Sequence, residues 1–224
     1  GGDLWFLSWN DCDNLTGLDN ITYIGGDLIF EGVILDDLTG LDNLNSIGGS
    51  LRIFNNNLIS LTGLENLTSI GGDLLIGFDP WLGNFYLADL TGLDNLSSIG
   101  GNIEIMNNDL LNSLAGLESL SSIEGSLIIG GNEGNPNLSS LTGLDNVTSI
   151  GENVWIEFNP ALTSLTGLDN LTSVGSDIWI YSNYGLTTLS SLSSLSTIGG
   201  SLSIDNNTVL TNLTGLEKHK LCCR

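Results

Sequence analysis

Acidic residues that recur at one place in a repeated motif are the first candidates for chemistry in this chain of 224 residues. These positions are Asp19, Asp42, Glu65, Asp94, Glu118, Asp145, Asp169 and Glu217. Clustered carboxylate oxygens suit Ca²⁺, so the candidate calcium ligands are Asp19, Asp42, Asp94, Asp145 and Asp169. A metal is not required, because an Asp in a bend can hydrogen-bond nearby backbone groups. We expect no cofactor, with calcium as the alternative.

Residues suited to acid–base or nucleophilic catalysis are scarce. The single histidine is His219, and no Gly-rich phosphate loop or metal-ligand spacing occurs. Arg52 is the only basic residue within the repeats, so it is the only basic side chain that could assist a cluster of acidic residues there. A catalytic site needs such groups side by side. The sequence therefore predicts that the protein is not an enzyme.

The charge balance excludes two classes of partner. Four basic residues stand against 26 acidic ones, which gives a formal net charge of −22 at pH 7. Nucleic acids and anionic membrane surfaces repel such a chain. No apolar run reaches the roughly 18 residues of a membrane span. We expect neither nucleic-acid binding nor membrane insertion.

A repeated motif positions all of these residues. Nine copies resembling LTGLENLTSIGGDL at 61–74 begin 23 to 29 residues apart, at Leu15, Leu38, Leu61, Leu90, Leu114, Leu141, Leu165, Leu189 and Leu213. Repeats of this length are typical of solenoids, whose turns bury their apolar faces against one another. We predict one solenoid over residues 1–216 and an irregular, basic, cysteine-containing tail over 217–224.

The spacing of apolar residues changes within each copy. Leu165, Leu168 and Leu171 follow at steps of three, whereas Ile178 and Ile180 are two residues apart. A step of two indicates a short strand, steps of three indicate successive bends, and abundant Gly, Asn, Thr and Ser exclude helix. The prediction is an all-β solenoid of about nine rungs.

Two kinds of residue are expected to form the corners. Glycines before the strand, such as Gly71, Gly175 and Gly199, would supply positive φ angles. Asparagines at the far end of the strand would bond the turn backbone in a ladder; these are Asn108, Asn132, Asn159, Asn183 and Asn207.

The combined pattern L-x-x-L-x-x-L-x-x-I-G-G-x-L-x-I-x-x-N-x-x-L resembles the receptor L-domain branch of the leucine-rich repeat superfamily, from residue 1 to about 217. The resemblance implies a right-handed β-solenoid and an extracellular or cell-surface role in binding or adhesion. The near-identical rungs, without cysteine-rich neighbours, are similar to arrays on bacterial and microbial-eukaryote surface proteins.

Aromatic residues on the outward side of the strands are the candidate contacts for a protein or glycan at the cell surface. Trp155, Trp179 and Tyr181 fall on adjoining rungs and would form an exposed patch. The alternative is that aromatic residues simply pack well along a sheet. The longer copy at 77–89 adds a loop that either makes contacts or folds over the strands. The complete candidate set is Trp5, Trp81, Phe85, Tyr86, Trp155, Trp179 and Tyr181.

Recurring threonines suggest a minor alternative, an ice-binding protein. The column contains Thr16, Thr39, Thr62, Thr91, Thr142 and Thr166. Ice-binding faces usually carry paired, flat arrays, whereas this column is single.

The two ends suggest another alternative, a structural subunit of a head-to-tail surface filament. Three of the four basic residues lie in 217–224, and the first rungs are acidic. The tail of one chain would dock on the next, with Cys222 or Cys223 cross-linked to Cys12. Such a heterologous contact does not close on itself, so it grows filaments.

The filament hypothesis predicts oligomers that depend on the tail. Under oxidising conditions, non-reducing gels and electron microscopy should show oligomers that shorten when residues 217–224 are removed. An intact chain that stays monomeric at high concentration would contradict the hypothesis.

Overall fold

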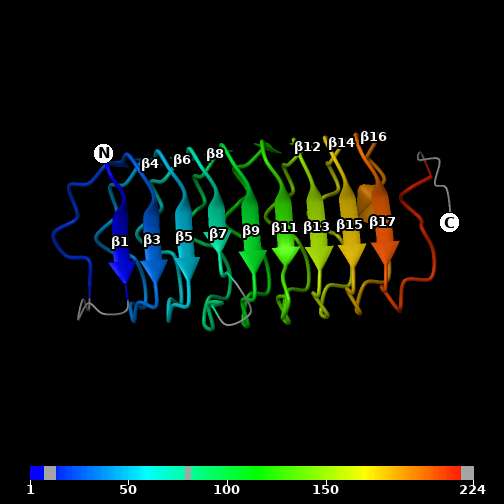
Figure 1. Cartoon of the computed structure of the whole chain (residues 1–224), viewed down its shortest axis with the longest axis horizontal. Coiled ribbons are helices and arrows are strands. Elements are labelled where there is room, and N and C mark those ends of the chain that lie inside the picture. Colours follow the sequence, from blue (N-terminus) through cyan, green and yellow to red (C-terminus); the bar gives the residue numbers. More distant parts are fainter. Residues whose placement is uncertain (8–13, 79–81, 218–224) are drawn as a thin grey trace.

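The computed structural model describes residues 1–7, 14–78 and 82–217, and it is an all-β solenoid. One face is a nine-stranded parallel sheet in the order β1-β3-β5-β7-β9-β11-β13-β15-β17 (Figure 1). Its strands are β1 (Leu4–Leu7), β3 (Leu28–Glu31), β5 (Leu51–Phe54), β7 (Leu74–Ile76), β9 (Ile103–Met106), β11 (Leu127–Gly130), β13 (Val154–Glu157), β15 (Ile178–Tyr181) and β17 (Leu202–Asp205). The nine strands make eight turns of the solenoid from β1 to β17.

Two shorter parallel sheets run along the same solenoid. The first consists of β2 (Tyr23–Ile24), β4 (Ser46–Ile47), β6 (Ser69–Ile70) and β8 (Ser98–Ile99). The second consists of β10 (Ser122–Ile123), β12 (Ser149–Ile150), β14 (Ser173–Val174) and β16 (Thr197–Ile198). The helical content of the described residues is one 3₁₀ turn, η1 (Ser190–Leu192).

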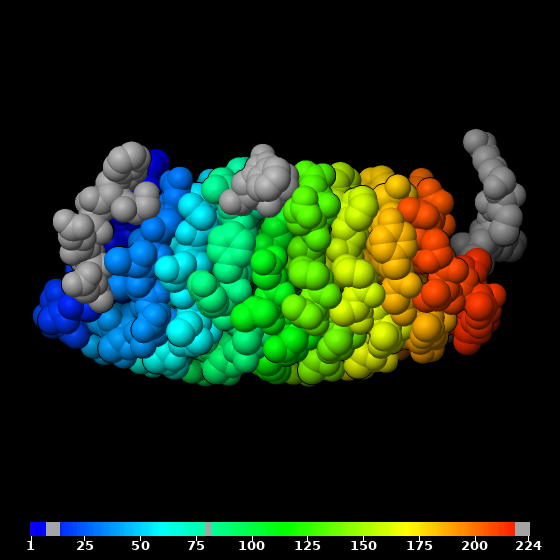
Figure 2. All heavy atoms as spheres, turned by 90° about the horizontal axis from the view of Figure 1, so that it is seen from below, coloured from blue at the N-terminus to red at the C-terminus, as the bar shows by residue number. Residues whose placement is uncertain are grey.

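The chain winds in a right-handed sense, as expected for parallel crossovers. In Figure 1 each long strand runs down the front, the chain returns behind it, and the next strand lies one position nearer the C-terminus. Figure 2, seen from the edge at which the long strands end, shows the rungs following one another in sequence order along the molecule. The predicted right-handed, all-β solenoid is confirmed. The domain boundary at residue 216 stays a prediction.

The core explains the two apolar spacings. In the second rung Leu41 N donates to Leu38 O (3.1 Å) and Leu44 N donates to Leu41 O (2.8 Å). Each such bond between residues three apart turns the chain, so every third side chain points inward, and all three leucines are fully buried. Alternate residues of the following strand, Leu51 and Ile53, complete the same core.

An asparagine ladder closes the corner after the seven long strands from β5 to β17. Its members are buried: Asn56, Asn84, Asn108, Asn135, Asn159, Asn183 and Asn207. In a typical rung, Asn159 Oδ1 accepts from the backbone N–H of Asn135 (3.3 Å), and Asn159 Nδ2 donates to Ile129 O (3.1 Å). The ladder therefore satisfies backbone groups of the preceding rung that water cannot reach.

One predicted ladder member is wrong. Asn132 is exposed, and Asn135 occupies the buried position instead, with its Oδ1 accepting from Asn108 N (3.0 Å). The longer copy inserts its extra residues between the end of β11 and the ladder, which displaces the ladder residue along the sequence. Asn84 belongs to the ladder for the same reason, after the insertion that follows β7.

The glycines before the strands have a different role from the predicted one. Gly71 and Gly199 do not have positive φ angles; the glycine of the L-T-G-L motif does, for example Gly63 at 105°. A Cβ at Gly71 would instead collide with the carbonyl oxygen of Gly48 in the preceding rung. Close approach of neighbouring rungs, and not backbone conformation, is what requires glycine here.

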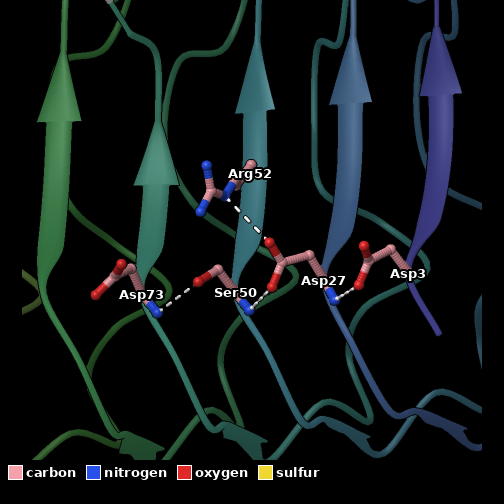
Figure 3. A network of polar contacts seen from close by, with 5 residues as sticks. All are labelled: Asp3, Asp27, Ser50, Arg52 and Asp73. Carbon is pink, nitrogen blue, oxygen red and sulfur yellow. Dashed lines mark hydrogen bonds and ion pairs between the residues drawn. The ribbon is translucent and has the colours of Figure 1, made fainter. Parts of the chain in front are cut away.

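A second ladder lies at the start of the long strands (Figure 3). Asp27 N donates to Asp3 Oδ1 (2.9 Å), Ser50 N to Asp27 Oδ1 (2.8 Å), and Asp73 N to Ser50 Oγ (3.0 Å). The same bond continues along the chain through Asn102 and later rungs. Asp, Ser and Asn all serve because each offers a short side-chain oxygen.

The ladder predicts a large difference between two asparagines three residues apart. Asn135→Ala removes the acceptor of Asn108 N and the donor to Ile105 O, so it should destabilise the fold by about 2 kcal/mol or more. Asn132→Ala, at an exposed position, should change stability by less than about 0.5 kcal/mol. Thermal or urea unfolding of the two variants measures the difference. Equal midpoints would show that the ladder does not contribute to stability.

Candidate functional site

The outward side of the nine-stranded sheet carries two columns of side chains, which the strand register defines on its last three strands. Trp155 pairs with Trp179, which pairs with Ser203, across β13, β15 and β17. The next outward column pairs Glu157 with Tyr181 and Tyr181 with Asp205. These six residues form two rows of three on adjoining strands, and we call them the outward cluster.

Contacts between aromatic rings fix the geometry of the outward cluster. The rings of Trp155 and Trp179 are edge to face, with centroids 4.9 Å apart and an interplanar angle of 86°. Tyr181 makes a similar contact with Phe158, at 5.5 Å and 76°. Trp155 and Tyr181 nevertheless keep 40% and 38% of their surface exposed. The rings are thus held in place by their neighbours while their faces remain accessible.

A hollow of about 290 Å³ lies over the outward cluster. It is lined by Trp155, Glu157, Trp179, Ile180, Tyr181, Ser203 and Asp205. The volume is at the small end of ligand sites. The hollow combines apolar ring surface with two carboxylates and two hydroxyls, those of Tyr181 and Ser203.

Burial raises the pKa of the Glu157 carboxyl above its ordinary value of 4.5. Desolvation disfavours the charged form, and an adjacent cation would favour it. The one basic residue in the described ranges, Arg52, is on β5, where its Nε lies 3.5 Å from Asp27 Oδ2 (Figure 3). Three strands, β7, β9 and β11, lie between β5 and β13. Arg52 is therefore too far along the sheet to neutralise Glu157.

The structure does not bring all of the predicted contact residues together. Trp5 is 55% exposed but lies on β1, with five strands between it and β13. Phe85 and Tyr86 are exposed and follow Asn84, so they lie beyond the ladder corner and not on the strand face. Trp81 lies outside the described residues.

Phe78, in the loop of the longer copy at 77–89, contacts the strand face. The ring of Phe78 lies 6.0 Å from that of Phe54, which belongs to the second outward column. Asn107 joins this loop to the later insertion, because its Nδ2 donates to Phe78 O (2.9 Å) and its Oδ1 accepts from Glu133 N (3.0 Å). The two insertions are thus tied together across the rung between them.

The recurring acidic residues hydrogen-bond their own turns. Asp42 Oδ2 accepts from Gly40 N (2.7 Å) and Asp145 Oδ2 from Gly143 N (2.9 Å), two residues earlier in the chain. The other members, including Asp19, Asp94 and Asp169, make the same bond. Within the described ranges no three or more His, Cys, Asp or Glu side chains form a group that could hold a metal ion. The calcium alternative stays a prediction, as do Cys12, Cys222 and Cys223, which lie outside those ranges.

Phe158 is a residue whose role the sequence did not indicate. Its φ angle is 54°, in the left-handed region that bulky residues rarely occupy. The equivalent residues before the ladder are Asn55, Asn107, Ser182 and Asn206, also at positive φ. In the sequence, Phe158 could have been noticed because Asn or Ser holds the equivalent position in those four rungs. The strained turn places the Phe158 ring against Tyr181.

Residues 121–210 match the family model of the receptor L domain. This part of the chain is receptor L-domain-like. No curated protein and no solved structure gives a significant match. The matched residues run from just before β10 into the segment after β17, so they include the whole outward cluster. Receptor L domains are non-enzymatic, ligand-binding repeat domains and are typically extracellular.

Within residues 1–7, 14–78 and 82–217, no helix combines the length and the apolar character needed to cross a membrane.

The raised pKa of Glu157 predicts that its charge costs stability. An acid whose pKa rises on folding destabilises the fold at pH values above that pKa, and this cost vanishes below the ordinary value of 4.5. Glu157→Gln should therefore unfold at a higher temperature than the parent at pH 7, and the difference should disappear as the pH falls below 4.5.

Glu133→Gln is the matched control, because it removes one charge from an exposed position on the same highly acidic chain. Thermal unfolding from pH 3 to pH 8 measures both variants. An equal gain in the control would show that the effect is general charge repulsion and not burial of Glu157.

Proposed function

We propose that this protein is a non-catalytic, extracellular or cell-surface binding module that acts through the outward cluster, as one unit of an adhesive surface array. The observation that carries the proposal is a set of mutually packed aromatic rings, among them the exposed Trp155 and Tyr181, beside a hollow of about 290 Å³. Aromatic residues with accessible faces and little freedom of movement are the residues that dominate binding surfaces.

The position of the rings supports binding over a packing role. The core lies on the inward side of the sheet, where Ile156 and Ile180 are buried, and it is complete without Trp155 or Trp179. Exposed aromatic surface costs free energy in water unless a partner covers it. The match to a ligand-binding domain family over the same residues supports the same function.

The alternatives from the sequence remain predictions. The filament hypothesis depends on cysteines and a basic tail outside the described residues. For the ice-binding alternative, Thr166 is exposed, and its Oγ1 lies 2.7 Å from Ser164 Oγ within its own turn. Inhibition of ice recrystallisation would depend on such threonines and not on the tryptophans.

Removal of the two indoles tests the proposed function. Trp155→Ala/Trp179→Ala should weaken binding at least about tenfold, because central interface tryptophans commonly contribute about 2 kcal/mol or more. The measurement is binding of the labelled chain to a glycan array and to an array of purified cell-surface proteins. Tyr23→Ala is the control, since Tyr23 is 60% exposed on β2, in a different sheet.

The spots that the parent chain binds should be lost in the tryptophan variant and kept in the control. Spots retained at parental intensity by a folded tryptophan variant would contradict the proposal.

A further inference from the structure

The order of the six residues in the outward cluster is specific. In one row Trp155, Trp179 and Ser203 follow one another, and in the other Tyr181 lies between Glu157 and Asp205. Adjacent parallel strands are about 4.8 Å apart. A group placed over the Tyr181 ring thus has a carboxylate-bearing strand on each side and the Trp179 indole beside it.

We infer that the hollow binds the guanidinium of an arginine side chain presented by a basic segment of a partner protein. The inference rests on the proposed binding function and specifies the chemistry of the ligand. Cations are attracted to the faces of Trp and Tyr rings, and carboxylates pair with guanidinium by charge and by parallel hydrogen bonds. The outward cluster supplies both kinds of group within one small site.

The charge of the surroundings favours a cationic ligand. The chain carries a formal charge of −22, and the only ion pair among the described residues is that of Arg52 with Asp27. Glu157 and Asp205 line the hollow, and burial raises the pKa of Glu157. A guanidinium would compensate the desolvation of that carboxylate, whereas a neutral ligand would bury it further without compensation.

The shape of the site favours arginine over lysine. Guanidinium is planar, stacks on aromatic rings and is more weakly hydrated than ammonium, so it loses less on entering a partly apolar hollow. The edge-to-face contact of Trp155 with Trp179 and the contact of Phe158 with Tyr181 hold the rings before binding. Such preorganisation reduces the entropy lost when a flexible side chain is captured.

A neutral glycan is the competing ligand class, since sugars also stack on aromatic rings. It would leave the two carboxylates to act only as hydrogen-bond acceptors. Binding of a glycan should therefore depend on the indoles and hardly on the charge of Glu157 and Asp205.

The test uses the full chain with four probes at about 0.15 M salt: tri-arginine, tri-citrulline, tri-lysine and a neutral maltohexaose. Titration calorimetry and tryptophan fluorescence measure binding. Tri-arginine should bind, tri-citrulline, which has nearly the same shape without the charge, should bind at least about tenfold more weakly, and tri-lysine should lie between them.

Two double variants separate a specific site from general attraction to an acidic protein. Glu157→Gln/Asp205→Asn should weaken tri-arginine binding about tenfold or more, with the aromatic packing kept. Asp109→Asn/Glu133→Gln changes the net charge equally at exposed positions, and should change binding less than about twofold.

Equal binding of tri-arginine and tri-citrulline, or equal weakening by the two double variants, would overturn the inference. Maltohexaose binding that requires Trp155 and Trp179 but survives in Glu157→Gln/Asp205→Asn would also overturn it, and would leave the proposed function standing with a glycan as ligand. If the tryptophan variant also keeps every partner on the arrays, the proposed function fails as well.

Discussion

The spacing of about 4.8 Å between stacked rungs is the constraint on which the rest of this structure depends. At this distance any side chain at a corner meets its counterpart in the next rung, and any buried backbone group must find a partner there. At the corners, side-chain oxygens accept hydrogen bonds from the backbone N–H groups of the neighbouring rung. Asn183 Oδ1 accepts from Asn159 N after the long strands, and Asp27 Oδ1 accepts from Ser50 N before them. Glycine holds the positions where a Cβ would meet the neighbouring carbonyl, as at Gly71.

The inward and corner positions are fixed by this stacking, and the outward positions of the long strands are not. Core positions repeat Leu and Ile almost without change, whereas the first outward column changes from Trp5 to Arg52 to Ser203. Side chains there lie outside the continuous core cluster, although Ile29 and Leu75 are themselves buried. They are free to vary from rung to rung, and this freedom allows one rung to differ chemically from the next on an otherwise repetitive scaffold.

The parts of the molecule that follow from periodicity could be predicted from the sequence, and the parts that depend on contact between rungs could not. Steps of three and of two located the bends and strands, and they placed Trp155 and Trp179 on one face. They did not show that the ladder residue after β11 is Asn135 and not Asn132. Both are asparagines, and the sequence does not show on which side of the ladder position the extra residues of this copy lie. Nor did they show why glycine precedes each strand, since the colliding carbonyl belongs to another rung.

The same limit applies to the outward cluster. Glu157 and Asp205 could be assigned to an outward column, but the hollow that both residues line and the burial of Glu157 depend on side-chain packing between rungs. A desolvated carboxylate beside a constrained aromatic ring is unfavourable for the isolated chain. The proposed binding of a guanidinium would recover part of the free energy that burial of the Glu157 charge costs the fold.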